Sequence, residues 1–448
     1  MSADDGGSPP SPPAPPPVPE IARPGALMRL RSYLVDLTPL RTSRQFRLLW
    51  MGQSVSDIGT LGITWVAIPF QVYALTRSPF AVGLVALFEL VPVLALGLVG
   101  GAIADAVDRR KLLLWANLGQ AAAAALLALN ARPSLDHLWV VYVLASVQAA
   151  LSAVARPAFD STIPRLVPKE LLPSAIATYV VAGTFGFLVG PLLGGSIIAA
   201  FGLAVAYLVD AGTFVWALAF VAAMAPVPPH HESGPPSLRS IREGLRFAAG
   251  HRVLLGTFLA DLVGQIGGMP QALFPAVALR LGGGPRTLGL LFSAGATGSF
   301  LVNLFGGRGK HVRRQGAVIL VATAVWGAGI VGFGLATTLW LALVCLAVAS
   351  GADMLSGIFR MAIPAAVVPD RLRGRVSGIG LIVVDVGPAL GNLEAGAVGS
   401  LVGVPFSIVS GGLACIAGAA ILAAALPAFT LYDASKPAQP GEGTAPSP

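Results

Sequence analysis

The sequence predicts an all-α integral membrane protein, with twelve transmembrane helices arranged as two pseudo-symmetric bundles of six. Three observations predict this class: the composition, the spacing of apolar segments and an internal repeat. Of the 448 residues, 55% are hydrophobic and only 11% are charged, whereas soluble globular chains carry about 25% charged residues. A chain of this length has room for about twelve spans of roughly 20 residues with short connections.

Long apolar segments follow one another from residue 48 to residue 427. We expect the first six spans near residues 48–74, 80–103, 112–131, 137–157, 174–200 and 203–225. We expect the second six near 253–279, 286–306, 315–337, 338–360, 376–401 and 404–427. Each segment is long enough to cross the hydrocarbon core as an α-helix.

The basic residues indicate how these spans are oriented. The net charge is +8, yet only Arg77, Arg132, Arg280 and Arg286 of the 29 Lys and Arg residues fall on the outer side if the N-terminus is inside. This bias follows the positive-inside rule for bacterial membrane proteins. We therefore expect both termini in the cytoplasm, and anionic membrane lipid rather than nucleic acid as the partner of the basic charge.

The chain divides into five stretches. Residues 1–40 are Pro-rich, lack the apolar segment of a cleavable signal peptide and are expected to form a disordered tail. Residues 41–226 form the first six-helix bundle, 227–251 a cytoplasmic linker and 252–428 the second bundle. The linker includes a basic amphipathic stretch, Leu238 to Phe247, expected along the membrane surface. Residues 429–448 are polar and Pro-rich and are expected to be a second disordered tail.

The two halves share sequence patterns at a nearly constant offset. The glycine-proline pattern of residues 186–195, which contains Gly190-Pro191, is repeated as Gly387-Pro388-Ala-Leu-Gly391. Two other pairs match, Ile163-Pro164 with Ile363-Pro364 and Gly100-Gly101 with Gly306-Gly307, and all three offsets are 197 to 206 residues. Duplication of a six-helix unit leaves such a pattern, which is typical of membrane transporters.

Several of these segments resemble a known family. Gly101-Ala-Ile-Ala-Asp105-Ala-Val-Asp-Arg109-Arg110-Lys111 resembles the loop motif between helices two and three of the major facilitator superfamily. Gly186 to Gly195 resembles the helix-five motif of that superfamily's proton-coupled exporters. Arg44-Gln-Phe-Arg-Leu-Leu-Trp50, Ser56-Asp57-Ile-Gly59 and Pro369-Asp-Arg-Leu-Arg-Gly374 are similar to the enterobactin-exporter branch. The resemblance implies the major facilitator fold, with two bundles around a central cavity and transport by alternating access.

The loop motif has two interpretations. The resemblance implies that Gly101, Asp105, Arg109 and Arg110 form a gate that closes the inner side in one state, through a carboxylate near helix ends and arginines. The family has an arginine directly after the aspartate, whereas this chain has Ala106, which weakens the expected charge relay. The alternative is a turn that only sets topology.

The helix-five motif also has two interpretations. Its members, spaced at three and four residues on one helix face, are Gly186, Gly190, Pro191, Gly194 and Gly195. A face without side chains lets a neighbouring helix approach closely, so in the first interpretation the motif is only a packing seam. The resemblance favours a hinge and seal that bias the protein toward export.

Carboxylates within the predicted spans are the candidates for proton or substrate binding. Charged groups in hydrocarbon are costly and are usually retained for function, and burial favours the neutral form of an acid. We rank Glu89, Asp57 and Asp353 first, followed by Asp261 and Asp385; Asp210 and Glu394 also lie within spans. The alternative for each is a neutral acid that is hydrogen-bonded to a neighbouring helix.

Two arginines near the inner ends of spans four and ten complete the candidate residues. Arg156 and Arg360 occupy corresponding places in the two halves and could pair with Asp160 or Asp370, or contact an anionic substrate. Simple anchoring at the interface is the alternative, because long basic side chains reach the surface readily. Cys345 and Cys415 are interpreted as packing residues, and neither a metal site nor a cofactor is expected.

These observations together predict a proton-coupled exporter of a bacterial cytoplasmic membrane rather than an enzyme. No Gly-rich loop followed by Lys and Ser or Thr is present, so this chain is not expected to hydrolyse ATP. The expected partners are a small-molecule substrate, protons and membrane lipid, and the chain is expected to act as a monomer. The cargo is expected to be a siderophore; the alternatives are a multidrug or macrolide exporter and a non-transporting membrane receptor or scaffold.

Overall fold

The structure is a computed structural model, and it describes residues 36–228, 246–305 and 312–433. Side chains of residues 98–105, 305, 370, 371 and 381 lie outside this description. The predicted tails and the amphipathic stretch from Leu238 fall mostly on residues that are not described, so these expectations stay predictions. Within the described residues, 12 helical spans are long and apolar enough to cross a membrane. The predicted all-α membrane fold is thereby confirmed.

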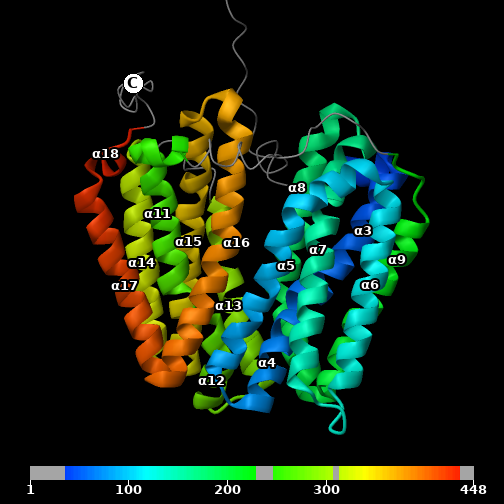
Figure 1. The fold of residues 1–448 in the computed structure, drawn as a ribbon, viewed down its shortest axis with the longest axis horizontal. Helices are drawn as coiled ribbons and strands as arrows, with labels where there is room; N and C mark the ends of the chain where they lie inside the picture. Colours follow the sequence, from blue (N-terminus) through cyan, green and yellow to red (C-terminus); the bar gives the residue numbers. More distant parts are fainter. Residues whose placement is uncertain (1–35, 229–245, 306–311, 434–448) are drawn as a thin grey trace, which may run out of the picture. The chain divides into compact units, whose positions relative to one another are not determined.

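The first half of the described chain contains six of these spans (Figure 1). Its elements are α2 (Thr38–Thr42), α3 (Arg44–Ile58), η1 (Gly59–Thr64), α4 (Trp65–Thr76), α5 (Pro79–Ala106), α6 (Arg109–Asn130), α7 (Leu138–Leu166), η2 (Lys169–Leu171), α8 (Leu172–Phe201) and α9 (Leu203–Ala222). The first span is interrupted, because the π-helical segment η1 joins α3 to α4.

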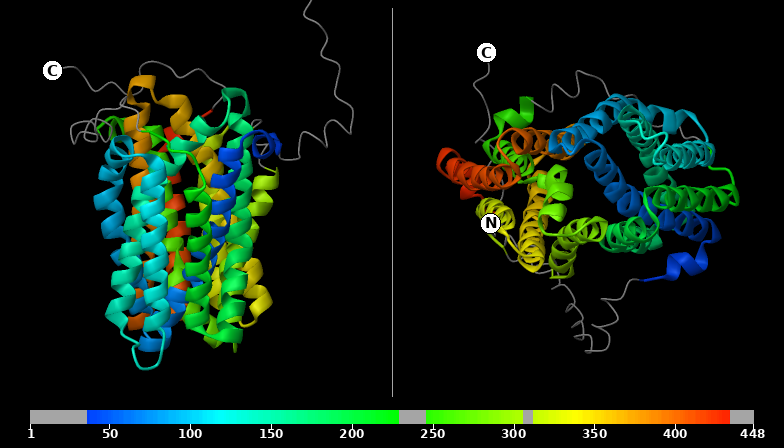
Figure 2. Two further views of the ribbon diagram at one scale, coloured as in Figure 1. Left: turned by 90° about the vertical axis from the view of Figure 1, so that its right-hand side faces the viewer. Right: turned by 90° about the horizontal axis from the view of Figure 1, so that it is seen from below.

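The second half repeats the arrangement. Its elements are α11 (Arg252–Gly268), η3 (Pro270–Leu273), α12 (Phe274–Arg280), α13 (Pro285–Phe305), α14 (Gln315–Leu335), α15 (Leu339–Val367), α16 (Asp370–Leu401), α17 (Val404–Ala425) and α18 (Pro427–Thr430). Here the first span is also broken, by the 3-10 turn η3 after Gly268. Viewed along the helix axes, α3–α9 and α11–α17 form two groups (Figure 2).

Several spans are longer than the sequence predicts. The fourth and tenth spans continue to Leu166 and Val367, beyond the predicted ends at residues 157 and 360. Helix α7 runs through Pro157 and Pro164, and α15 runs through Pro364. Proline is tolerated in membrane helices, where neighbouring helices and local adjustments satisfy the freed backbone groups. The prediction ended these two spans too early because it treated polar residues and proline as the ends of the helices.

The two halves contact each other mainly through four helices near one end of the bundle. This predicted outer end carries the turns at residues 77–78, 131–137, 202, 281–284, 336–338 and 402–403. There α5 packs on α16 and α8 packs on α13 (Figure 1). The Phe80 backbone N–H donates to Ser400 Oγ at 2.9 Å, which links the start of α5 to the end of α16.

Glycines make this contact possible. A Cβ on Gly83 would lie 2.5 Å from the Asn392 carbonyl oxygen, and one on Gly396 would lie 2.6 Å from the Pro79 carbonyl oxygen. At the other crossing, a Cβ on Gly195 would clash with the Pro285 backbone. The helices of the two halves therefore touch backbone to backbone at the predicted outer end.

The same four helices separate toward the other, predicted inner end. A Cβ on Gly97, Gly183, Gly374 or Gly378 would meet no atom of the described residues within 4 Å. Gly380 of α16 has only Phe258, from its own half, nearby at 3.7 Å. The space between the halves is thus closed at the predicted outer end and open toward the predicted inner end.

Candidate functional site

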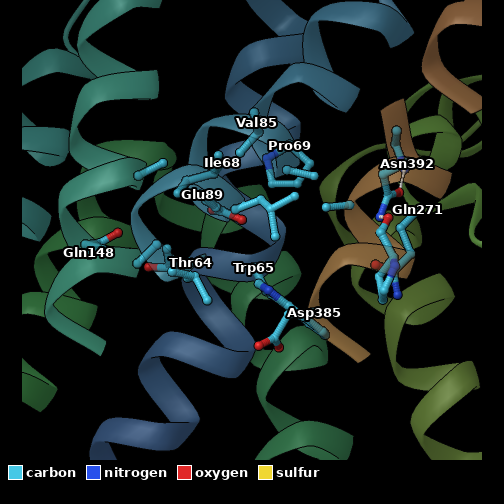
Figure 3. Close-up of a pocket in the computed structure, with 18 of the residues that line it drawn as sticks. Thr64, Trp65, Ile68, Pro69, Val85, Glu89, Gln148, Gln271, Asp385 and Asn392 are labelled. Carbon is cyan, nitrogen blue, oxygen red and sulfur yellow. Dashed lines mark hydrogen bonds between the residues drawn. The ribbon is translucent and has the colours of Figure 1, made fainter. Parts of the chain in front are cut away.

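A cavity of about 410 Å³ lies between the two halves. The first span, α5 and α7 line it on one side, and η3, α13 and α16 line it on the other. Its wall is mostly apolar, with a few polar side chains (Figure 3). The volume falls within the range of about 300–1,000 Å³ that is usual for small-molecule sites. This cavity is therefore the candidate substrate site.

Two carboxylates face the cavity from opposite halves. Glu89 comes from the middle of α5 and Asp385 from α16, and both line the cavity (Figure 3). Glu89 is half-buried, and no described residue donates a hydrogen bond to it or forms an ion pair with it. No Lys or Arg is among the described residues that line the cavity. The site therefore offers hydrogen-bond acceptors and negative charge, and its described residues include no basic side chain that would bind an anion.

An aromatic group stands at the centre of the cavity wall. Trp65 follows the π-helical segment η1 in the first span, and 36% of its surface is exposed. Its ring centroid lies 5.1 Å from that of Phe187 on α8 and 6.1 Å from that of Phe292 on α13. Trp65 therefore bridges the two halves and offers a flat surface for a ring-bearing molecule.

Three amide side chains complete the polar wall: Gln148, Gln271 and Asn392. Asn392 Oδ1 accepts from the Ala272 backbone N–H at 2.8 Å, so Asn392 holds the break between α11 and α12. The Nε2 atom of Gln148 is buried and has no partner among the described residues. A bound molecule or water would satisfy this donor.

Arg360 forms a buried ion cluster in the second half. Its Nη1 lies 2.6 Å from Asp261 Oδ1 on α11, and its Nη2 lies 2.8 Å from Asp353 Oδ1, two turns earlier on α15. The three side chains are 13%, 9% and 28% exposed, respectively. The sequence suggested pairing with Asp370 or a substrate anion, whereas Arg360 is engaged by two carboxylates from within the spans.

A related pair stands at the matching position in the first half. Asp57 on α3 and Arg156 on α7 precede Asp261 and Arg360 by the same number of residues, 204. Gln53 donates to Asp57 Oδ1 at 2.9 Å, but Asp57 and Arg156 are not within ion-pair distance of each other. Arg156 is exposed and lies close enough to interact electrostatically with the carboxyl groups of Asp57, Asp160 and Asp385. Arg360 and Asp261 therefore form an ion pair, whereas the pseudo-symmetric Arg156 and Asp57 do not.

The glycine motif of α8 contacts the first span and the opposite half. Gly186 lies beside Ile58, and Gly190 lies directly against the backbone of Gly62 in η1. Gly194 lies against Ile63, whereas Gly195 and the Pro191 carbonyl group face α13 at Pro285 and Gly289. The motif thus joins the first span, α8 and α13 at the closed side of the cavity.

The loop motif is described only in part. The side chains around Gly101, including that of Asp105, lie outside the described residues. Arg109 is 3% exposed; its Nε donates to Ser161 Oγ at 2.7 Å and its Nη1 donates to the Pro228 carbonyl group at 3.2 Å. Arg110 donates to the carbonyl groups of Val221 and Ala222. In this conformation these contacts join α6 to α7 and to the end of α9, within one half.

Sequence reasoning did not single out several cavity residues: Thr60, Thr64, Trp65, Gln148, Gln271, Phe292 and Asn392. They are common residue types in membrane helices, and only the rotation of each helix brings them to one space. The break in the first span could have been predicted, because Gly59 and Gly62 in Gly-Thr-Leu-Gly-Ile-Thr interrupt an otherwise apolar span.

Comparison with known proteins identifies the family. A family profile described as transmembrane secretion effector matches residues 35–441. The chain belongs to this family. It is therefore a multi-pass membrane protein and a transporter of the major facilitator superfamily, not an enzyme. The expected superfamily is confirmed.

Curated relatives of the family bear a common name. The enterobactin exporter EntS of Citrobacter koseri is 28% identical over 376 residues, which cover 84% of this chain and 90% of the relative. The enterobactin exporter EntS of Escherichia coli (strain E24377A) is also 28% identical over the same shares of both chains.

Solved structures show the same fold. The POT family transporter PepTSo matches with a TM-score of 0.69 at 15% identity, covering 86% of this chain and 98% of that one. A bacterial homologue of the human lysosomal transporter Spinster, in an inward-facing and unoccupied conformation, matches with a TM-score of 0.65 at 18% identity. That match covers 90% of this chain and 98% of the homologue.

Proposed function

We propose that the protein exports a small molecule by alternating access with proton antiport, and that its cargo is a siderophore. The observation that carries this proposal is the central cavity, into which Glu89 and Asp385 project from opposite halves. The cavity is closed by the α5–α16 and α8–α13 contacts and open toward the predicted inner end. An exporter that waits for cargo from the cytoplasm has this arrangement.

The chemistry of the cavity supports a siderophore in its iron-free form. Such molecules present hydroxyl and amide donors around aromatic rings. Glu89, Asp385 and the amide oxygens of the wall supply acceptors, and Trp65 and Phe292 supply ring surfaces. A ferric complex with net negative charge would be repelled by the two carboxylates. The relatives named enterobactin exporters favour the same cargo.

Proton coupling is assigned to the carboxylates of the spans. Glu89 has no partner among the described residues and can exchange a proton for cargo within the cavity. Asp353 shares Arg360 with Asp261, so the Arg360 cluster holds one more carboxylate than it has cations. Proton binding there would release Arg360 from one partner, which links protonation to the packing of α11 on α15.

Export of cationic drugs is the second candidate function. The carboxylates and aromatic rings of the cavity, together with the absence of basic lining residues in the described part, also suit an amphipathic cation. A macrolide with an amino group would make the same contacts. A non-transporting receptor or scaffold is disfavoured, because it has no need for unpaired acids inside its spans.

The location follows from the charge bias. We place the protein in the cytoplasmic membrane of a bacterium, as a monomer with both termini in the cytoplasm and basic side chains against anionic lipid. The glycine motif of α8 would act as the seal at the outer side, and the Asp105 loop motif would close the inner side in the other state.

Deletion of the gene in its host tests the cargo. Secreted and intracellular siderophore would be quantified under iron limitation. We expect siderophore to be retained inside the deletion strain and to be released again when the wild-type protein, but not Glu89→Gln, is restored at equal expression. Unchanged secretion would contradict siderophore export, and accumulation of ethidium in the deletion strain would then support drug export.

A further inference from the structure

We propose that Asp210 is a proton-binding site that acts through the π-helical segment of the first span. Asp210 lies on α9 and is not among the residues that line the central cavity. The inference builds on the proton coupling proposed above and names the residue at which a proton is held while the cavity is open to the predicted inner end.

Asp210 is fully buried and has only neutral partners. Its exposed fraction is 0%. Thr64 Oγ1 donates to Asp210 Oδ2 at 2.6 Å, and Thr213 Oγ1 donates to Asp210 Oδ1 at 3.4 Å. Among the described residues, no Lys, Arg or His lies within ion-pair distance of this carboxyl group.

The titratable neighbour of Asp210 lies on its own helix. Tyr207, one turn earlier on α9, is the titratable group that shares an electrostatic interaction with Asp210. From η1 and α4 only the Thr64 hydroxyl group faces it. In the described parts of α3, α6 and α8, which also pack on α9, no Lys, Arg or His lies within ion-pair distance of Asp210.

These surroundings require a neutral acid. A buried carboxylate without a cation costs several kcal/mol, whereas its neutral form can hydrogen-bond to hydroxyl groups. The Thr64 hydroxyl group can donate to the acid or accept from it. In this conformation Asp210 therefore holds a proton, and releasing that proton requires a change in its surroundings.

The π-helical segment η1 contacts Asp210, the α8 glycine motif and the central cavity. Gly59, its first residue, lies directly against the Asp210 carboxyl group, where a side chain would clash. Gly62 lies against Gly190 of the α8 glycine motif. Thr60 and Thr64 line the central cavity. Any shift of η1 that opens Asp210 to water must therefore also move the cavity wall and the α8 contact.

A π-helical segment is suited to such a shift. Its hydrogen bonds join residues five apart instead of four, so one turn contains an extra residue compared with an α-helix. Such segments occur often at functional sites. Rewinding η1 as α-helix would turn Thr64 relative to Asp210 and remove the hydrogen bond between them. Proton release from Asp210 and reorganisation of the first span would then be one event.

A polar seam begins at Tyr207, one turn from Asp210, and leads to the predicted outer end. The Tyr207 hydroxyl group donates to Gln71 Oε1 at 2.8 Å, and Gln71 Nε2 donates to Asp136 Oδ1 at 3.1 Å. Asp136 is exposed in the turn between α6 and α7. The seam runs between α4 and α9, which gives protons from the outer side an approach to Asp210 once it hydrates.

Infrared spectroscopy of the purified full-length protein tests the proposal without any cargo. At neutral pH, we expect the wild-type protein to show the C=O stretch of a protonated carboxylic acid, and we expect part of this band to be lost in Asp210→Asn. Identical carboxylic acid bands in both proteins would overturn the assignment. Glu394→Gln, a neutralisation outside the cavity and the seam, controls for general effects of removing a membrane carboxyl group.

A second variant covers the case in which Asp210→Asn does not fold. Thr64→Val removes the hydroxyl partner and keeps the acid. We expect the Asp210 band to shift in frequency in this variant, because the hydrogen bond to its carbonyl group is lost. An unshifted band would contradict the proposed partnership of Thr64 and Asp210.

Transport assays in proteoliposomes separate coupling from binding. Iron-free enterobactin and ethidium serve as probes, each measured as accumulation driven by a proton gradient and as exchange without one. We expect Asp210→Asn to lose gradient-driven accumulation and to retain exchange. Retention of both would overturn the proposal. Failure of the wild-type protein to exchange either probe would count against the proposed cargo, while the infrared result would still decide the role of Asp210.

Discussion

Carboxylates within the spans differ in which groups they contact. Glu89 faces the space between the halves without a partner among the described residues, whereas Asp261 is held by Arg360 at 2.6 Å. A carboxylate without a cation in an apolar wall is available to a ligand or a proton, and an ion-paired one stabilises the fold. The two kinds of acid therefore predict different responses to mutation.

Replacing Glu89 by Gln is expected to abolish transport and leave the fold intact. The amide preserves the volume of the side chain but can neither bind a proton nor carry charge. Cargo uptake into inside-out vesicles, compared at equal membrane abundance, measures the effect. Glu394→Gln provides a matched control, because Glu394 does not line the cavity. Normal uptake by Glu89→Gln would remove this residue from the mechanism.

The two pseudo-symmetric arginines are expected to differ in their effect on stability. Arg360→Ala leaves Asp261 and Asp353 without their cation, and breaking a buried pair in this way costs about 3–5 kcal/mol. Arg156→Ala removes an exposed side chain without a direct ion pair to a described residue and should change stability little. Thermal unfolding in detergent, followed by tryptophan fluorescence, compares the two. Equal losses would show that Arg156 is also ion-paired in solution.

Among the elements, the crossing of the first span and α8 depends most strictly on glycine. Gly190→Ala is expected to impair transport, because its Cβ would lie 2.6 Å from the Gly62 Cα atom in η1. Gly183→Ala on the same helix is the control, because its Cβ would meet no described atom within 4 Å. Transport rates at matched expression test the difference. Equal transport by the two variants would show that transport does not require this close contact between α8 and η1.

The elements also show what the sequence could predict. Apolar length and charge bias predicted the number and order of the spans, because each span must satisfy its own backbone in lipid. The residue types and spacing of the α8 glycines predicted a close approach to a neighbouring helix, but not that Gly62 would be one partner. The pairing of Arg360 with Asp261 needs residues 99 positions apart to meet, which depends on how α11 packs on α15.

The cavity could be predicted least. Trp65, Gln148 and Asn392 come from three different spans, and only the rotation of each helix turns them to one space. Glu89 was found because a carboxylate is rare within an apolar span. Asp210 is equally rare, but its importance became visible only with its burial and its contact to η1.

At the scale of the whole transporter, the described residues are open toward the predicted inner end. In a background without Cys345 and Cys415, Ser152→Cys in the cavity wall is expected to react with a membrane-impermeant maleimide in inside-out vesicles and not in right-side-out vesicles. Ser134→Cys, in the exposed turn at the predicted outer end, should show the opposite pattern. Reaction of Ser152→Cys only from the outer side, without a gradient, would contradict the proposed resting conformation.

The proposed export cycle requires that protons drive the movement of cargo through the central cavity. The most direct measurement is uptake of iron-free enterobactin into inside-out vesicles when the lumen is made acidic. We predict uptake that requires the gradient, stops when an ionophore dissipates it and is absent with Glu89→Gln. Uptake that is equal with and without the gradient, or equal in the wild type and Glu89→Gln, would contradict proton-driven export through this cavity.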